Sequence, residues 1–207
     1  MNYNMFVPSI SKEELRELPT GQFSGNIHLI DTREREDVAC EVLRTEQILG
    51  FDTETKPNFK KGNLNKVSLL QLSTSTDAFL FRLNKIGLSG QLGEILADEN
   101  IFKVGIAIRD DVRLLKQLHH FNEKGFVELQ DYVRQFGIEN SGLSKIAGIV
   151  LNFRISKSQQ LTNWENEHLT EAQQIYAATD AWAALEIYNV LAAIDLPLSE
   201  SDIVSDL

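Results

Sequence analysis

The sequence is poor in cysteine and in basic residues, and it contains no long apolar run. Its one cysteine is Cys40, so no disulfide can form within the chain, and we expect a reducing, cytoplasmic compartment. The start of the chain has no basic stretch followed by an apolar one, which argues against a signal peptide. No segment approaches the roughly 20 apolar residues that a membrane span requires, so we expect no membrane partner.

The shortage of basic residues gives the chain an acidic balance, with 30 Asp and Glu against 20 Lys and Arg and a formal net charge of -10. Such a protein is not drawn to nucleic acid by long-range attraction. Divalent cations bound at one site would offset part of this charge locally. Hydrophobic residues make up 43% of the 207 positions, which is enough for one domain with a substantial core.

Periodicity and turn residues predict one α/β domain, because a group of strands is followed by strands that alternate with helices. We expect a polar lead-in at 1–22 with a short helix at 11–18, the domain at 23–195 and an acidic tail at 196–207. Strands are predicted at 27–30, 48–55, 67–72, 78–83 and 102–108. Helices are predicted at 32–45, 88–97, 111–118, 128–136, 143–151 and 171–194, with a polar loop at 153–167.

The segment 48–55, ILGFDTET, carries the first functional signal. An apolar run rich in β-forming residues indicates a buried strand, and Asp52 and Glu54 point to the same face of it, about 7 Å apart. Two carboxylates in this position repel each other and lose hydration. A hard cation such as Mg²⁺ or Mn²⁺ removes both costs. The alternative is a strand that emerges into a solvated acidic turn.

The helix predicted at 171–194 carries the second signal. Thr170 and Gln173 form a capping-box pattern that sets its start. Asp180 lies on the stripe that should pack on the sheet, and a buried carboxylate needs a partner. Tyr176 is one turn earlier on the same face. The alternative is a core tyrosine with an aspartate bonded to a backbone amide. The stripe consists of Tyr176, Asp180, Ala184, Ile187, Leu191 and Ile194.

A third acidic cluster, Asp110-Asp111, lies where a strand is predicted to meet a helix. Asp111 shares a helical stripe with Leu115 and Leu118, which makes it the better candidate for an inward-facing carboxylate. Asp110 precedes the helix and is predicted to cap its N-terminus. A shift of one residue in the assumed position of the inward-facing acid would select Asp110 instead.

Taken together, the segments 51–55 (FDTET), 103–115 (KVGIAIRDDVRLL) and 176–188 (YAATDAWAALEIY) resemble the motifs of the DEDDy 3′–5′ exonucleases. This group includes ribonuclease D, the exonuclease domain of the Werner syndrome helicase and polymerase proofreading domains. A related class has a catalytic histidine at the position of Ile175, so the tyrosine class is favoured. We expect no counterpart of the C-terminal nucleic-acid-binding domain of ribonuclease D, and this departure from the family pattern puts transfer RNA processing in doubt.

The resemblance implies a ribonuclease H-like fold, with a mixed β-sheet flanked by helices, and two Mg²⁺ or Mn²⁺ ions. By that analogy Asp52 bridges both ions, Glu54 and Asp180 hold the first, and Asp111 orients the second through water. Tyr176 orients the attacking water, because a phenol with a pKa near 10 is a poor base at neutral pH. The substrate would be the 3′ end of single-stranded DNA or RNA, and the product a nucleoside 5′-monophosphate.

Two polar segments are candidates for contacts with the substrate strand. Lysines and one aromatic follow the first motif, and they could bind phosphates and stack on a base, or simply form a solvated hairpin loop. A second set precedes the last helix, where the tryptophan could instead anchor the loop. The candidates are Phe59, Lys60 and Lys61, with Lys56 and Lys66 nearby, and Arg154, Lys157 and Trp164.

Two other functions remain compatible with the pattern. One is a nucleic-acid-binding module on the same fold that has lost its chemistry, although the presence of all five motif residues argues against it. The other is a different metal-dependent phosphodiesterase with a ribonuclease H-like core, such as an endonuclease.

Overall fold

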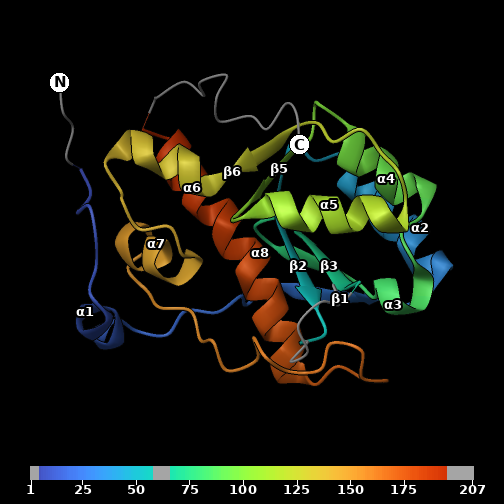
Figure 1. The fold of residues 1–207 in the computed structure, drawn as a ribbon, viewed down its shortest axis with the longest axis horizontal. Helices are drawn as coiled ribbons and strands as arrows, with labels where there is room; N and C mark the ends of the chain where they lie inside the picture. Colours follow the sequence, from blue (N-terminus) through green and yellow to red (C-terminus); the bar gives the residue numbers. More distant parts are fainter. Residues whose placement is uncertain (1–4, 58–65, 195–207) are drawn as a thin grey trace.

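A computed structural model describes residues 5–57 and 66–194 of the chain. Within these residues the strands form a single six-stranded sheet in the order β1-β4-β3-β2-β5-β6 (Figure 1). A mixed sheet flanked by helices confirms the predicted fold class. The strands are β1 Asn26–Ile30, β2 Ile48–Thr55, β3 Val67–Ser73, β4 Asp77–Phe81, β5 Phe102–Gly105 and β6 Phe126–Glu128.

The central strand β2 has different neighbours along its length. It pairs antiparallel with β3 from Gly50 to Thr55, but parallel with β5 only over Ile48–Gly50. Within the described part of the chain, the second half of β2 therefore has a strand on one side only. The succession β2, β3, β4 is antiparallel throughout, whereas β1 pairs parallel with β4 and β6 with β5.

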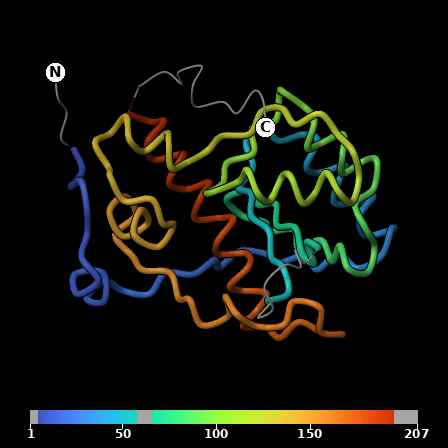
Figure 2. Tube along the Cα trace, viewed as in Figure 1, coloured from blue at the N-terminus to red at the C-terminus, as the bar shows by residue number. Residues whose placement is uncertain are grey.

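Helices cover both faces of the sheet (Figures 1 and 2). One core joins the sheet to α2, α3, α4 and α5, and a second core joins it to α6, α7 and α8. The helices are α1 Lys12–Glu17, α2 Arg33–Leu43, α3 Leu83–Ile86, α4 Gly90–Ala97, α5 Ile108–Leu118, α6 Leu129–Tyr132, α7 Leu143–Val150 and α8 Glu171–Ala192, with a 3₁₀ turn at Val133–Phe136. None of the described helices is both long and apolar enough to span a membrane.

The helix α8 lies directly against the middle of the sheet. Its start has the predicted capping box, in which Thr170 Oγ1 accepts from the Gln173 amide at 3.2 Å and Gln173 Oε1 accepts from the Thr170 amide at 3.0 Å. A Cβ atom at Gly50 would lie only 2.0 Å from the Ala181 carbonyl oxygen. Glycine at position 50 therefore allows the backbone of α8 to approach β2 this closely.

The lead-in segment packs onto the body of the domain. It contains the predicted short helix, now α1. Further along, the Arg154 amide donates to the Pro19 carbonyl at 2.9 Å and the Gly21 amide donates to the Arg154 carbonyl at 3.0 Å. The Phe23 amide donates to Thr179 Oγ1 on α8 at 3.0 Å. These bonds connect the segment to the loop at 153–167 and to α8.

Several predicted boundaries are wrong. The strand predicted at 102–108 ends at Gly105, because the chain turns at Ala107, which has a left-handed backbone (φ 56°), and α5 begins at Ile108. The strand β6 was missed, since three residues are too few to show periodicity. The helix predicted at 32–45 is slightly shorter, since α2 runs from Arg33 to Leu43.

Candidate active site

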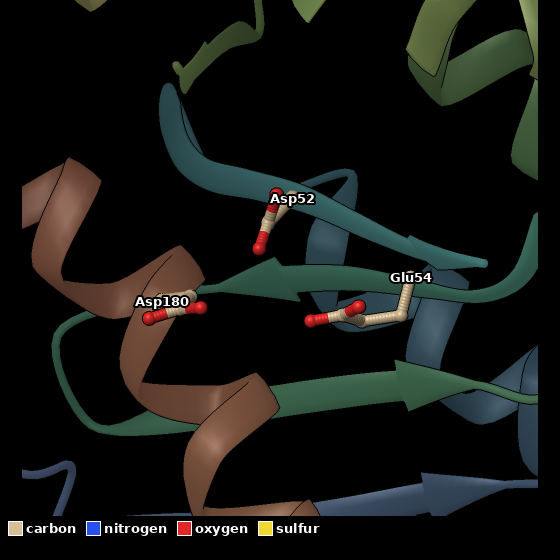
Figure 3. A group of neighbouring side chains, drawn as sticks. All are labelled: Asp52, Glu54 and Asp180. Atoms are coloured by element: carbon tan, nitrogen blue, oxygen red, sulfur yellow. The ribbon is translucent and has the colours of Figure 1, made fainter. Parts of the chain in front are cut away.

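Three acidic side chains meet where α8 crosses β2. Asp52 and Glu54 extend from one face of β2, and Asp180 extends toward them from α8 (Figure 3). One carboxylate oxygen from each of the three lies within 4.8 Å of the other two. Strand alternation places the first two on one face, and the close approach at Gly50 brings in the third, which is the neighbour of Ala181. We refer to these three residues as the acidic triad.

The acidic triad lies at a cleft of about 300 Å³. Glu54 and Asp180 are only 9% and 8% exposed. The lining of the cleft combines apolar side chains, among them Ile106, Leu143 and Ile155, with the acids and Tyr176. A charged group and an apolar group can therefore be bound side by side in this cleft.

Electrostatics in the cleft disfavour the charged form of all three acids. Burial raises the pKa of Asp52 well above its usual range, and the charges of Asp180, Glu54 and Asp111 raise it further. Burial and the charges of Asp180 and Asp111 raise the pKa of Glu54 to about 9. Burial also raises the pKa of Asp180 to about 7, against the opposing effects of a hydrogen bond from Tyr176 and the charge of Lys157.

This environment fits a divalent cation. Among the described residues, no lysine or arginine forms an ion pair with a member of the acidic triad. The donors are all carboxylate oxygens, which suit Mg²⁺ and Mn²⁺. A bound cation would supply the positive charge that these buried acids lack.

The fourth predicted acid, Asp111, lies beside the acidic triad rather than within it. As predicted, Asp111 faces inward, and its Oδ1 accepts a hydrogen bond of 2.6 Å from Thr53 Oγ1. Burial raises its pKa to about 6, although the bond from Thr53 opposes this. Its charge acts on Asp52 and Glu54, so it belongs to the same electrostatic cluster.

The prediction that Asp110 caps α5 is wrong. The helix starts at Ile108, so Asp110 lies within its first turn, where its side chain is 80% exposed and pairs with Arg113 at 2.9 Å. The capping role belongs to a residue that the sequence analysis missed. Glu128 accepts hydrogen bonds from the amides of Ala107 and Ile108, both at 3.0 Å.

Tyr176 occupies the predicted place on the buried stripe of α8, and it is 9% exposed. Its hydroxyl forms a side-chain hydrogen bond with Asp180. Burial and the negative charge of Asp180 raise the pKa of Tyr176 above its usual value. The phenol therefore stays protonated at neutral pH and acts as a hydrogen-bond donor.

The predicted substrate contacts have different outcomes. Trp164 cannot line a strand path, since it is 0% exposed and packs against the Tyr176 ring with centroids 6.0 Å apart. Its large apolar ring anchors the loop instead. Lys157 is exposed at the mouth of the cleft. Arg154 donates to the Leu18 carbonyl, and Lys56 pairs with Glu165 at 2.9 Å. Phe59, Lys60 and Lys61 lie outside the described residues.

Comparison with known proteins identifies the class that this fold and this acidic cleft define. A family profile described as 3′–5′ exonuclease matches residues 27–194. The chain therefore belongs to the 3′–5′ exonuclease domain family, and the resemblance to its DEDDy members is confirmed.

Individual relatives agree with this assignment. The mouse bifunctional 3′–5′ exonuclease/ATP-dependent helicase WRN is 33% identical over 162 residues, covering 75% of this chain but 12% of the mouse protein. The Nibbler EXO domain of Aedes aegypti has a TM-score of 0.73 at 26% identity, covering 83% of this chain and 91% of that domain. Ribonuclease D of Trypanosoma brucei, in complex with RNA U12, has a TM-score of 0.76 at 20% identity and covers 86% and 66%.

The chain spans about half or less of the length of several curated relatives that it matches. The activities and partners of those longer proteins are therefore properties of those proteins, and for this chain they are matters of proposal.

Proposed function

We propose that this protein is a metal-dependent 3′–5′ exonuclease, which removes nucleotides one at a time from the 3′ end of a single strand and releases nucleoside 5′-monophosphates. The observation that carries the proposal is the acidic triad. Three carboxylates, of which Glu54 and Asp180 are buried and Asp52 is half-buried, have raised pKa values and no basic ion-pair partner among the described residues, so they are costly to maintain without a cation. The family to which the chain belongs supports the same chemistry.

Asp52 is the acid best placed to be shared between cations. One of its carboxylate oxygens lies within 4.8 Å of oxygens from both Glu54 and Asp180, and its pKa is raised by burial and by the charges of Asp180, Glu54 and Asp111. Glu54 and Asp180 would complete the innermost ligand set, and Asp111 would act from the side of α5. Bound divalent cations would activate water and neutralise the leaving 3′-oxygen in an in-line displacement.

Tyr176 would orient the attacking water. Its phenol keeps its proton, because burial and Asp180 raise its pKa, so it does not act as the base. Its ring is held against buried Trp164, and its hydroxyl is engaged by Asp180. A donor fixed in this way costs little reorganisation when the reaction occurs.

Substrate binding would use both sides of the cleft. The apolar lining residues Ile106, Leu143 and Ile155 suit a base or sugar, while Lys157, which lines the cleft and is exposed, can contact a phosphate. Lys60, Lys61 and Phe59 remain candidates for further contacts. The complex of the Trypanosoma brucei relative with RNA U12 supports including single-stranded RNA among the substrates.

A direct test uses strands of DNA and of RNA that are labelled at the 5′ end. They are incubated with the protein in Mg²⁺, in Mn²⁺ or in a chelator. We expect a ladder that shortens by single nucleotides only when metal is present, with nucleoside 5′-monophosphates as the small products. Internal cuts would indicate an endonuclease, and binding without cleavage would indicate a silent binding module; either result contradicts the proposal.

A further inference from the structure

Thr53 differs from its two neighbours in the strand motif because it faces the opposite side of β2. Asp52 and Glu54 project toward α8, so strand alternation turns Thr53 toward the side on which α5 packs. There its hydroxyl donates a 2.6 Å hydrogen bond to Asp111. Thr53 is thus the motif residue that connects β2 to the fourth acid.

The backbone that carries Asp111 is also fixed, by a separate contact. The residue before α5, Ala107, has no side-chain cap of its own. The carboxylate of Glu128, at the end of β6, accepts from the amides of Ala107 and Ile108 instead, and also from the Gln130 amide at 3.1 Å. Glu128 therefore fixes the start of α5 and, with it, the backbone position of Asp111. The orientation of the Asp111 side chain must be fixed by another contact.

We infer that Thr53 is a positioning residue that holds the Asp111 carboxylate in a fixed orientation for a divalent cation or its bound water. This inference rests on the proposed function. A hydroxyl that donates to a carboxylate forms a short, strong hydrogen bond, and here it uses one oxygen of Asp111. The remaining lone pairs stay available to a ligand. Groups that orient metal ligands in this way commonly change metal affinity by about 10–100-fold when they are removed.

The test compares Thr53→Val, which keeps the shape of the side chain but removes the donor, with Thr53→Ser, which keeps the donor. Mn²⁺ affinity is measured by calorimetry, and the cleavage rate is measured as a function of Mn²⁺ concentration. We expect Thr53→Val to weaken Mn²⁺ binding and to raise the Mn²⁺ concentration for half-maximal rate by about tenfold. Thr53→Ser should stay close to the wild type in Mn²⁺ affinity, and metal-free melting curves should show that both variants are folded. Thr53→Ala replaces Thr53→Val if that variant does not fold.

A second comparison asks whether Thr53 acts through Asp111. In an Asp111→Ala background, the same Thr53→Val change should cause no further loss of Mn²⁺ affinity. Unchanged Mn²⁺ affinity in Thr53→Val, an equal loss in Thr53→Ser, or a full additional loss in the Asp111→Ala background would overturn the inference. If the wild type cleaves no nucleic acid, the proposed function fails, but the calorimetry still decides the role of Thr53.

Discussion

At the scale of single residues, burial of the cleft carboxylates lowers the stability of their charged form and at the same time favours the binding of a cation. An aspartate that is removed from water and surrounded by three other acids holds its proton more tightly. A divalent cation would reverse that preference, so the same arrangement would bind metal strongly. Removal of one of these charges should therefore leave the metal-free protein as stable as the wild type or more stable.

Asp52→Asn should lower the metal-dependent cleavage rate by about a thousandfold or more, which corresponds to about 4 kcal/mol of transition-state stabilisation, because a shared ligand is lost. Metal-free Asp52→Asn should be at least as stable as the wild type, since one repelling charge is gone. Asp110→Asn makes the same chemical change at an exposed position and should leave both rate and stability near wild type. Near-full activity of Asp52→Asn in Mg²⁺ would mean that the site is misassigned.

Tyr176→Phe should reduce turnover by about 10²-fold, because only the hydroxyl that bonds to Asp180 is removed. The ring still packs against Trp164, so the melting temperature should change little. Tyr188→Phe is the matched control, since it removes another buried hydroxyl from α8 away from the cleft. Equal turnover in the two variants would make Tyr176 a core residue.

At the scale of elements, the site depends on how closely α8 lies over β2. The alternation of β2 was sufficient to predict that Asp52 and Glu54 share one face, and the periodicity of α8 that Asp180 points into the protein. That the three meet in one site was implied by the family resemblance. Local patterns describe one element at a time, however. They did not show that Glu128, from a strand of three residues, caps α5 in place of Asp110. Nor did they decide between a buried and an exposed Trp164, because that depends on the packing of the loop against α8.

Gly50→Ala should destabilise the protein by about 2–3 kcal/mol or more, because the new Cβ would lie 2.0 Å from the Ala181 carbonyl oxygen and push α8 outward. The displacement would also move Asp180, so Mn²⁺ binding should weaken. Thermal unfolding and calorimetry measure the two effects.

Gly90→Ala is the control for this change. No atom lies within 4 Å of the Cβ position at Gly90, the first residue of α4, so the substitution should be neutral or stabilising by up to about 1 kcal/mol. If Gly50→Ala were as stable as Gly90→Ala, the close approach of α8 would not be required.

At the scale of the whole molecule, the raised pKa values make stability depend on pH. The pKa of Asp111 is raised to about 6 and that of Asp180 to about 7, above the value near 4 expected in the unfolded chain. Between the unfolded-chain pKa near 4 and the raised pKa of each acid in the folded protein, the folded protein binds more protons than the unfolded chain. The stability of the metal-free protein therefore falls as pH rises. Buried Lys103, whose pKa is lowered to about 7, opposes this trend only above that pH.

The melting temperature of the metal-free protein should therefore fall between pH 5 and pH 7. Saturating Mn²⁺ should raise the melting temperature most at the upper end of this range, because the cation binds the deprotonated acids. Asp180→Asn should flatten the metal-free profile, and Asp110→Asn should not. A metal-free melting temperature that rises over this interval would show that these acids are not held in the buried, mutually repelling arrangement.

The acidic triad must bind a divalent cation if the protein cleaves nucleic acid as proposed. Anomalous diffraction from crystals grown with Mn²⁺ would locate that cation independently of any activity. We predict an anomalous peak in the cleft, within about 2.0–2.6 Å of carboxylate oxygens from Asp52, Glu54 and Asp180. If Mn²⁺ at a saturating concentration were bound elsewhere and left the three carboxylates uncoordinated, that result would contradict the claim that the acidic triad is a metal site.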